Sequence, residues 1–70
     1  MALTKKSFSL SGHRTSVALE AEFWAVLDAE TKRAGASLAA LVARIDAGRG
    51  ARPLASALRL HALESARRSG

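Results

Sequence analysis

The sequence predicts one small domain that is mostly α-helical with one β-strand near its N-terminus, and three observations lead to that fold class. The chain has 70 residues, the length of a single domain with a thin core. Apolar and polar residues alternate over 14–19, as in a strand, and the spacing becomes helical from Glu20 onward. Glycine and proline then divide the remainder into three helical stretches. The strand either stands alone or forms a short hairpin.

The predicted strand has two faces of different chemistry. Alternate residues share a face, and the two faces comprise Thr15, Val17 and Leu19 on one side and Arg14, Ser16 and Ala18 on the other. Ser11-Gly12 is a plausible turn, so residues 1–12 form either a basic N-terminal arm or the first strand of a hairpin. A lone strand is not stable in water, and no further strand is predicted after Glu20. We therefore expect the strand to pair with a second copy of the chain.

Two consecutive helices follow the strand. The first is expected over 21–34, where Gly35 supplies a left-handed stop, and the second over 38–47, where Ser37 is a good N-cap. Each has an apolar stripe at helical spacing: Phe23, Val26, Leu27 and Ala34 in the first, and Leu38, Leu41, Val42 and Ile45 in the second.

A third helix is expected after a loop. Residues 48–53 contain glycine, arginine and proline, which favour a loop, and an apolar pattern then resumes over 54–67. Its leucines occupy more than half of the helix circumference: Leu54, Leu58, Leu60 and Leu63. Such a helix needs more than one neighbour, while residues 68–70 have nothing to bury and are expected to fray.

The charge distribution points to a polyanionic partner. The formal net charge is +5, and it is concentrated at the two ends of the chain. Residues 1–19 carry three basic residues and no acid, residues 20–46 carry five acids and three bases, and residues 47–70 carry five arginines and one acid. Basic ends of this kind suit nucleic acid or an anionic lipid surface, against the alternative of ordinary surface charge.

The composition excludes several other classes. There is no cysteine, so disulfides and thiolate metal sites are excluded, and two separated histidines make a poor metal site. No metal or other cofactor is predicted. The chain has no glycine-rich phosphate-binding loop and no set of residues spaced for catalysis, which argues against an enzyme. With no apolar run long enough to span a membrane and no signal-peptide pattern, the sequence predicts a cytoplasmic protein.

The order of strand, helix, Gly-Ala-Ser turn and helix resembles the ribbon-helix-helix family of bacterial and phage DNA-binding proteins, which includes Arc-like and methionine-repressor-like members. The matching residues are Arg14–Leu19, Phe23 and Leu27 on the first helix, and Gly35-Ala-Ser37 before a second helix with Leu38, Leu41 and Ile45. Further short motifs resemble those of a subgroup of short bacterial members with an extra C-terminal helix: His13-Arg14-Thr15-Ser16, Phe23-Trp24, Ser37-Leu38, Ile45-Asp46 and Ser56-Ala57-Leu58-Arg59. The resemblance divides the chain into an arm or first strand (1–12), a ribbon-helix-helix core (13–47), a loop (48–53) and a C-terminal helix with its tail (54–70).

The resemblance implies an intertwined homodimer whose antiparallel β-ribbon lies in the major groove of double-stranded DNA. It also implies that the protein regulates transcription, as a repressor does. It implies base reading by the outward residues Arg14, Ser16 and Ala18, of which Ala18 departs from the polar pattern. It implies phosphate contacts at Ser37 and the Leu38 amide, and Lys5, Lys6 and His13 are further candidates for phosphate contact. The implied dimer core is Val17, Leu19, Phe23, Leu27, Leu38, Leu41, Val42 and Ile45.

Two questions stay open at this stage. Trp24 lies about 100° around the helix from Phe23, so it either packs on the third helix or a partner chain, or it joins dimers into a higher oligomer. The main rival function is a protein-interaction or assembly module, similar to an antitoxin or scaffold, that uses the third helix. His61 is expected to be a packed or partly exposed neutral histidine rather than a ligand.

Overall fold

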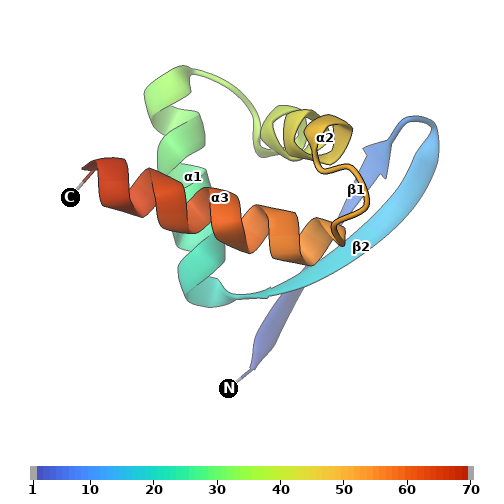
Figure 1. Cartoon of the computed structure of the whole chain (residues 1–70), viewed down its shortest axis with the longest axis horizontal. Helices are drawn as coiled ribbons and strands as arrows, with labels where there is room; N and C mark the ends of the chain where they lie inside the picture. Colours follow the sequence, from blue (N-terminus) through green and yellow to red (C-terminus); the bar gives the residue numbers. More distant parts are fainter. Residues whose placement is uncertain (1, 70) are drawn as a thin grey trace.

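The computed structural model describes residues 2–69 and contains a β-hairpin followed by three helices. The elements are β1 (Leu3–Leu10), β2 (His13–Glu20), α1 (Ala21–Ala34), α2 (Leu38–Gly48) and α3 (Leu54–Ser69). In Figure 1 the hairpin curves along one side of the molecule, and α3 crosses α1 on the other side with α2 beside it. Gly70, part of the tail expected to fray, lies outside the described residues.

The strand partner is a finding that differs from the expectation. Over 13–20 the strand pairs with residues 3–10 of the same chain, in an antiparallel register that runs from Leu10↔His13 to Leu3↔Glu20. The reason is the turn: Ser11 has φ 51° and Gly12 has φ 80°. Two central residues with positive φ make the two-residue turn whose twist matches antiparallel strands. Residues 3–10 are therefore a strand and not an arm.

One face of the hairpin forms part of the core. Phe8 and Leu10 from β1 and Val17 and Leu19 from β2 are buried, and they pack with apolar residues of all three helices. The helical members of this cluster are Trp24, Leu27, Leu41, Val42, Leu58 and Ala62. Five residues expected in a dimer core are thus buried within one chain, namely Val17, Leu19, Leu27, Leu41 and Val42, while Phe23, Leu38 and Ile45 are partly buried against the same cluster.

The helix ends agree with the sequence signals. Gly35 takes φ 68° and its amide donates to the Thr31 carbonyl, which ends α1. The Ser37 hydroxyl accepts a hydrogen bond from the Ala40 amide at 3.0 Å and caps α2.

The buried face of α1 differs from the predicted stripe. Trp24, Leu27 and Thr31 are buried, whereas Val26 is only half-buried and Ala34 is exposed. Thr31 is tolerated there because its hydroxyl donates to the Asp28 carbonyl at 2.7 Å.

No helix in the described part of the chain has the length and apolarity needed to cross a membrane.

Candidate nucleic-acid interface

The outer face of the hairpin is built by strand alternation. Because Phe8, Leu10, Val17 and Leu19 point to the helices, the residues between them point away from the core. Apart from Leu3 and Glu20, which pair at the open end of the hairpin, the register places three pairs side by side on that outer face: Ser9 with Arg14, Ser7 with Ser16, and Lys5 with Ala18. Five of the six are exposed and Ala18 is half-buried. We call these six residues the outer face.

A hydrogen bond links the two strands at the centre of the outer face. The hydroxyls of Ser7 and Ser16 lie 3.0 Å apart, and either can donate. Each hydroxyl has one hydrogen and two lone pairs, so the pair keeps one donor and several acceptor positions for another molecule.

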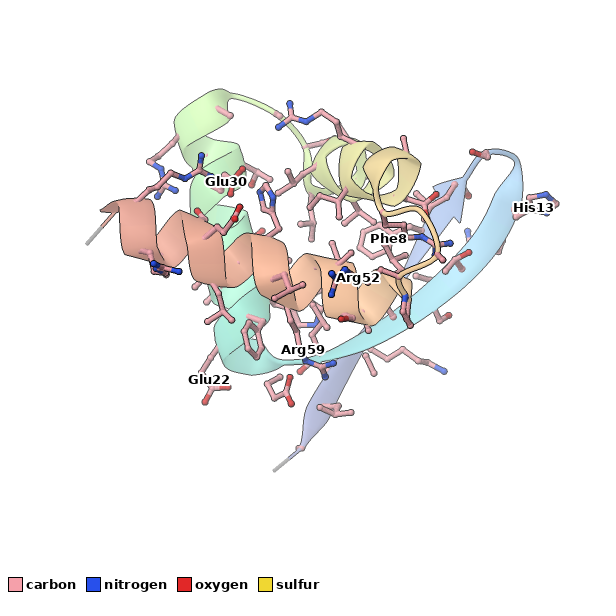
Figure 2. The ribbon with its side chains drawn as sticks, viewed as in Figure 1. Phe8, His13, Glu22, Glu30, Arg52 and Arg59 are labelled. Carbon is pink, nitrogen blue, oxygen red and sulfur yellow. The ribbon has the colours of Figure 1, made fainter. Side chains whose placement is uncertain are left out.

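The outer face is positively charged. Lys5 and Arg14 lie among its six residues, and none of the six is acidic. The nearest strand residue with a negative charge, Glu20, is bound at the end of β2 by the Arg59 guanidinium, with Nε 3.0 Å from Oε1. The pKa of the Glu20 carboxyl is lowered below its usual value. The main cause is a hydrogen bond from the backbone amide of Glu20 itself, and the second is the contact with Arg59. Figure 2 shows Arg59 reaching down from α3 to this end of the hairpin.

The structure separates two lysines that are adjacent in the sequence. Lys5 lies on the outer face, whereas Lys6 is opposite Val17 and its ammonium lies 5.5 Å from the centre of the Trp24 ring. Lys6 is therefore a cation–π partner of the core side and is not brought together with the outer face.

Trp24 has a partner that differs from those expected. It is 5% exposed, its ring centre lies 6.0 Å from that of Phe8, and its indole N–H donates to the Thr4 carbonyl at 2.8 Å. Trp24 thus contacts β1 of its own chain, in the core cluster that also contains Leu58 and Ala62 of α3. A tryptophan buried in this way has little surface left for joining dimers.

The remaining predicted phosphate contacts lie at two other places. His13 begins β2 beside the turn and points outward at the tip of the hairpin, whereas Phe8 points toward the helices (Figure 2). Ser37 and Leu38 are at the start of α2, which follows the α1–α2 loop and runs toward the turn end of the hairpin (Figure 1). The Ser37 side chain already accepts from Ala40, and Leu38 is half-buried.

Polar contacts between α1 and α3 hold the helical layer behind the hairpin. His61 Nε2 lies 2.9 and 2.8 Å from the two carboxylate oxygens of Glu30, and Arg33 donates to the Ser65 hydroxyl at 3.2 Å. Burial acts to raise the pKa of the Glu30 carboxyl, but hydrogen bonds from His61 and Ser65 outweigh it and leave the pKa below its usual value. His61 is thus packed against a carboxylate rather than only against apolar neighbours.

A second group of arginines lies away from the hairpin. Arg44, Arg49 and Arg52 border an open hollow of about 560 Å³ between the end of α2 and α3. Arg49 is held there by Asp46 at 2.7 Å and by the Arg52 carbonyl at 2.7 Å. Among residues 2–69, no three His, Asp or Glu side chains are grouped to hold a metal ion.

Comparison with known proteins identifies the fold. A family model described as a ribbon-helix-helix domain matches residues 3–66. The chain belongs to the ribbon-helix-helix family. Searches of the curated proteins and of the solved structures found no match. Ribbon-helix-helix domains are generally DNA-binding regulatory modules that act as dimers and are typically not enzymes.

The family match begins at residue 3 and therefore includes β1, which the sequence argument left undecided. Ser7 and Ser9 are outer-face residues that were not predicted from the sequence. The signal that could have found them was the alternation of Ser7, Phe8, Ser9 and Leu10 directly before a two-residue turn.

Proposed function

We propose that this ribbon-helix-helix protein binds double-stranded DNA sequence-selectively, with the outer face of its hairpin in the major groove, and that it represses or otherwise regulates transcription. One observation supports this most: the six residues of the outer face, five of them exposed, carry two cations and no acid on a two-stranded antiparallel ribbon, and Glu20 beyond them is paired with Arg59. A two-stranded ribbon has a width that the major groove admits. Regulation of this kind would take place in the bacterial cytoplasm.

The base-contacting roles follow from the chemistry of the β2 residues. Arg14 can donate two hydrogen bonds to guanine O6 and N7, and Ser16 can donate to or accept from several base edges. Ala18 can contact a thymine methyl group, although its half-buried position gives it less reach.

The phosphate-contacting roles fall to residues on the outer face, at the hairpin tip and at the start of α2. Lys5 lies on the outer face and His13 lies at the hairpin tip opposite Leu10, and each phosphate neutralised by a cation releases counterions and steepens the salt dependence of binding. The start of α2 offers unpaired backbone N–H groups near Ser37 and Leu38, which suit a phosphate because of the helix dipole. Lys6 would contribute only by giving up its position over Trp24.

We further propose that the protein acts as a homodimer, as the family generally does. The two-stranded sheet leaves one edge of β2 and one edge of β1 without a strand partner in the described chain. Leu60 and Leu63 on α3 are 43% and 51% exposed and offer a second apolar contact surface, which could also build higher oligomers. Sedimentation equilibrium tests this: a mass that stays at the 7.3 kDa of one chain at all concentrations would contradict the dimer.

The decisive experiment for DNA binding compares two arginine variants. Wild type, Arg14→Ala and Arg67→Ala are each incubated with a pooled random duplex library at low and moderate salt, and the bound fraction is sequenced. Arg67 is an exposed arginine of α3, so its variant matches the charge change without touching the hairpin. We expect wild type and Arg67→Ala to enrich the same motif and Arg14→Ala to lose it. No enrichment by wild type would overturn the proposal.

A protein-interaction module is the second candidate function. The exposed pair Leu60 and Leu63, three residues apart on α3, is the observation that favours it. Absence of any enriched DNA motif, together with loss of self-association in Leu63→Glu, would support this alternative.

A further inference from the structure

Glu20 is the acidic residue of the hairpin. Among the residues of β1 and β2 it alone carries a negative charge. Because alternate residues of a strand share a side, Glu20 continues the line of Arg14, Ser16 and Ala18, and the register sets it opposite Leu3. An unpaired carboxylate at this position would repel the phosphates of any DNA that approaches the outer face.

Two cations are placed to neutralise Glu20. Lys5 lies opposite Ala18 and is therefore a diagonal neighbour of Glu20 across the two strands. Diagonal neighbours in an antiparallel pair are about 7–8 Å apart, within reach of long side chains. The other cation is Arg59 of α3, and the structure pairs Glu20 with it, with Arg59 Nε 3.0 Å from Glu20 Oε1. Within residues 2–69 Lys5 has no ion pair, so its ammonium is free.

A second contact fixes the position of Arg59. Its guanidinium carbon lies 5.9 Å from the centre of the Phe23 ring, on the first turn of α1. A planar guanidinium can stack on an aromatic ring while its N–H groups donate to a carboxylate. The side chains of Arg59 and Glu20 are 34% and 26% exposed, so both are partly withdrawn from water. Figure 2 shows Arg59 beside the end of the hairpin at which β2 passes into α1.

We propose that Arg59 is a positioning residue for DNA binding: it neutralises Glu20 and keeps that carboxylate from pairing with Lys5, which leaves the Lys5 ammonium free for a DNA phosphate. This inference rests on the proposed DNA binding and adds a role for α3. The third helix contributes no residue to the outer face, yet it sets the charge at one end of it.

The first test removes the Arg59 side chain. Wild type and Arg59→Ala are titrated, at several salt concentrations, with a duplex carrying the selected motif and with an unrelated duplex of the same length. Arg59→Ala should weaken binding to both by about three- to tenfold, because the released carboxylate occupies Lys5 and repels phosphate. The slope of log affinity against log salt should become shallower by about 1 per protomer. The ratio between the two duplexes should not change, since the bases are read by other residues.

A rescue separates this role from a structural one. The double variant Arg59→Ala/Glu20→Gln lacks the released charge, and its affinity should return to within about twofold of wild type. Glu20→Gln alone should bind no more weakly than wild type, and Arg59→Lys, which keeps the positive charge, should retain most of the affinity. The glutamine removes no helix cap, because the Glu20 side chain makes no capping hydrogen bond to α1.

The matched control is Arg67→Ala, which removes the same charge from an exposed position of α3. It should leave affinity and salt slope close to wild type, and circular dichroism checks that each variant is folded.

The outcomes distinguish this inference from the proposed function. If wild type selects a motif but Arg59→Ala binds as wild type does, or if Glu20→Gln fails to rescue Arg59→Ala, the positioning role is wrong while DNA binding stands. An equal loss in Arg67→Ala would show that only the total charge matters, and it would also overturn the inference. If wild type selects no motif at all, both the inference and the proposed function are wrong.

Discussion

The two faces of the hairpin are made of alternate residues of the same two strands, yet the residues at the centre of each face differ in burial and in polarity. The inner face carries Phe8, Leu10, Val17 and Leu19, all buried under the helices. The outer face carries small polar residues and two cations, and most of it is open to solvent. Burial of the inner face stabilises the fold. The outer-face side chains are not part of the core, so their chemistry can serve ligand binding. Substitutions on the inner face should therefore impair folding, whereas substitutions on the outer face should impair DNA binding and leave folding intact.

The largest effect is expected from a charge on the inner face. Val17→Asp places an unpaired carboxylate in a site that is 5% exposed, and should cost about 4 kcal/mol or more, which is enough to unfold a small domain. Thermal unfolding followed by circular dichroism measures this. The control is Ser16→Asp, one residue away on the outer face, which should fold normally and yet lose DNA binding because of its charge. A stably folded Val17→Asp protein would contradict the assignment of the inner face to the core.

The turn that aligns the two faces should show the next effect. Gly12 has φ 80°, and a Cβ there would meet no neighbouring atom within 4 Å, so Gly12→Ala is strained only through its backbone. We expect a loss of about 1 kcal/mol in the free energy of unfolding, measured with urea. Gly48→Ala, at a glycine outside the positive-φ region and with equally open surroundings, should be neutral or slightly stabilising. Equal losses in the two variants would argue against the turn geometry.

The helical layer behind the inner face should respond to pH. Because the pKa of Glu30 is lowered in the folded chain, its contribution is fully present above its ordinary pKa of 4.5 and is lost as the pH falls through the folded value. Glu30→Gln should therefore be less stable than wild type by about 1 kcal/mol at pH 7, with the difference shrinking in acid. Urea unfolding at pH 7 and pH 3 measures this, with Glu64→Gln, an exposed residue of α3, as the control. A difference that is constant between the two pH values would show that the carboxylate contacts do not stabilise the fold.

The sequence predicted the parts of the fold that depend on local signals. The α1 bounds agree, α2 runs one residue beyond the expected end, and α3 continues to Ser69 instead of ending near Arg67. Gly35 and Ser37 act as expected because a left-handed stop and an N-cap are each decided by a few neighbouring residues.

Features that depend on distant residues were harder to predict. Two adjacent lysines such as Lys5 and Lys6 are typical of a solvent-exposed N-terminal arm. Only the pairing of 3–10 with 13–20 shows that they belong to a strand and lie on its two different faces. The buried stripe of α1 includes Thr31, which hydrophobicity does not indicate, and it includes Trp24, whereas Phe23 is only partly buried. The partner of Trp24 is twenty residues away in sequence, so no periodicity could reveal it.

The smallest effect on stability, and the one that separates the two faces most clearly, is expected from Arg14→Ala. Arg14 is exposed and the structure assigns it no ion pair within residues 2–69, so the free energy of unfolding should change by less than about 0.5 kcal/mol. Affinity for a selected duplex should nevertheless fall by roughly tenfold or more, since a two-bond contact to guanine is worth about 1–3 kcal/mol. Lys5→Ala should also leave stability unchanged, while reducing the slope of log affinity against log salt by about 1 if Lys5 contacts a phosphate. A parallel loss of stability and affinity in Arg14→Ala would mean that the outer face supports the fold, and the separation of folding from recognition across the hairpin would fail.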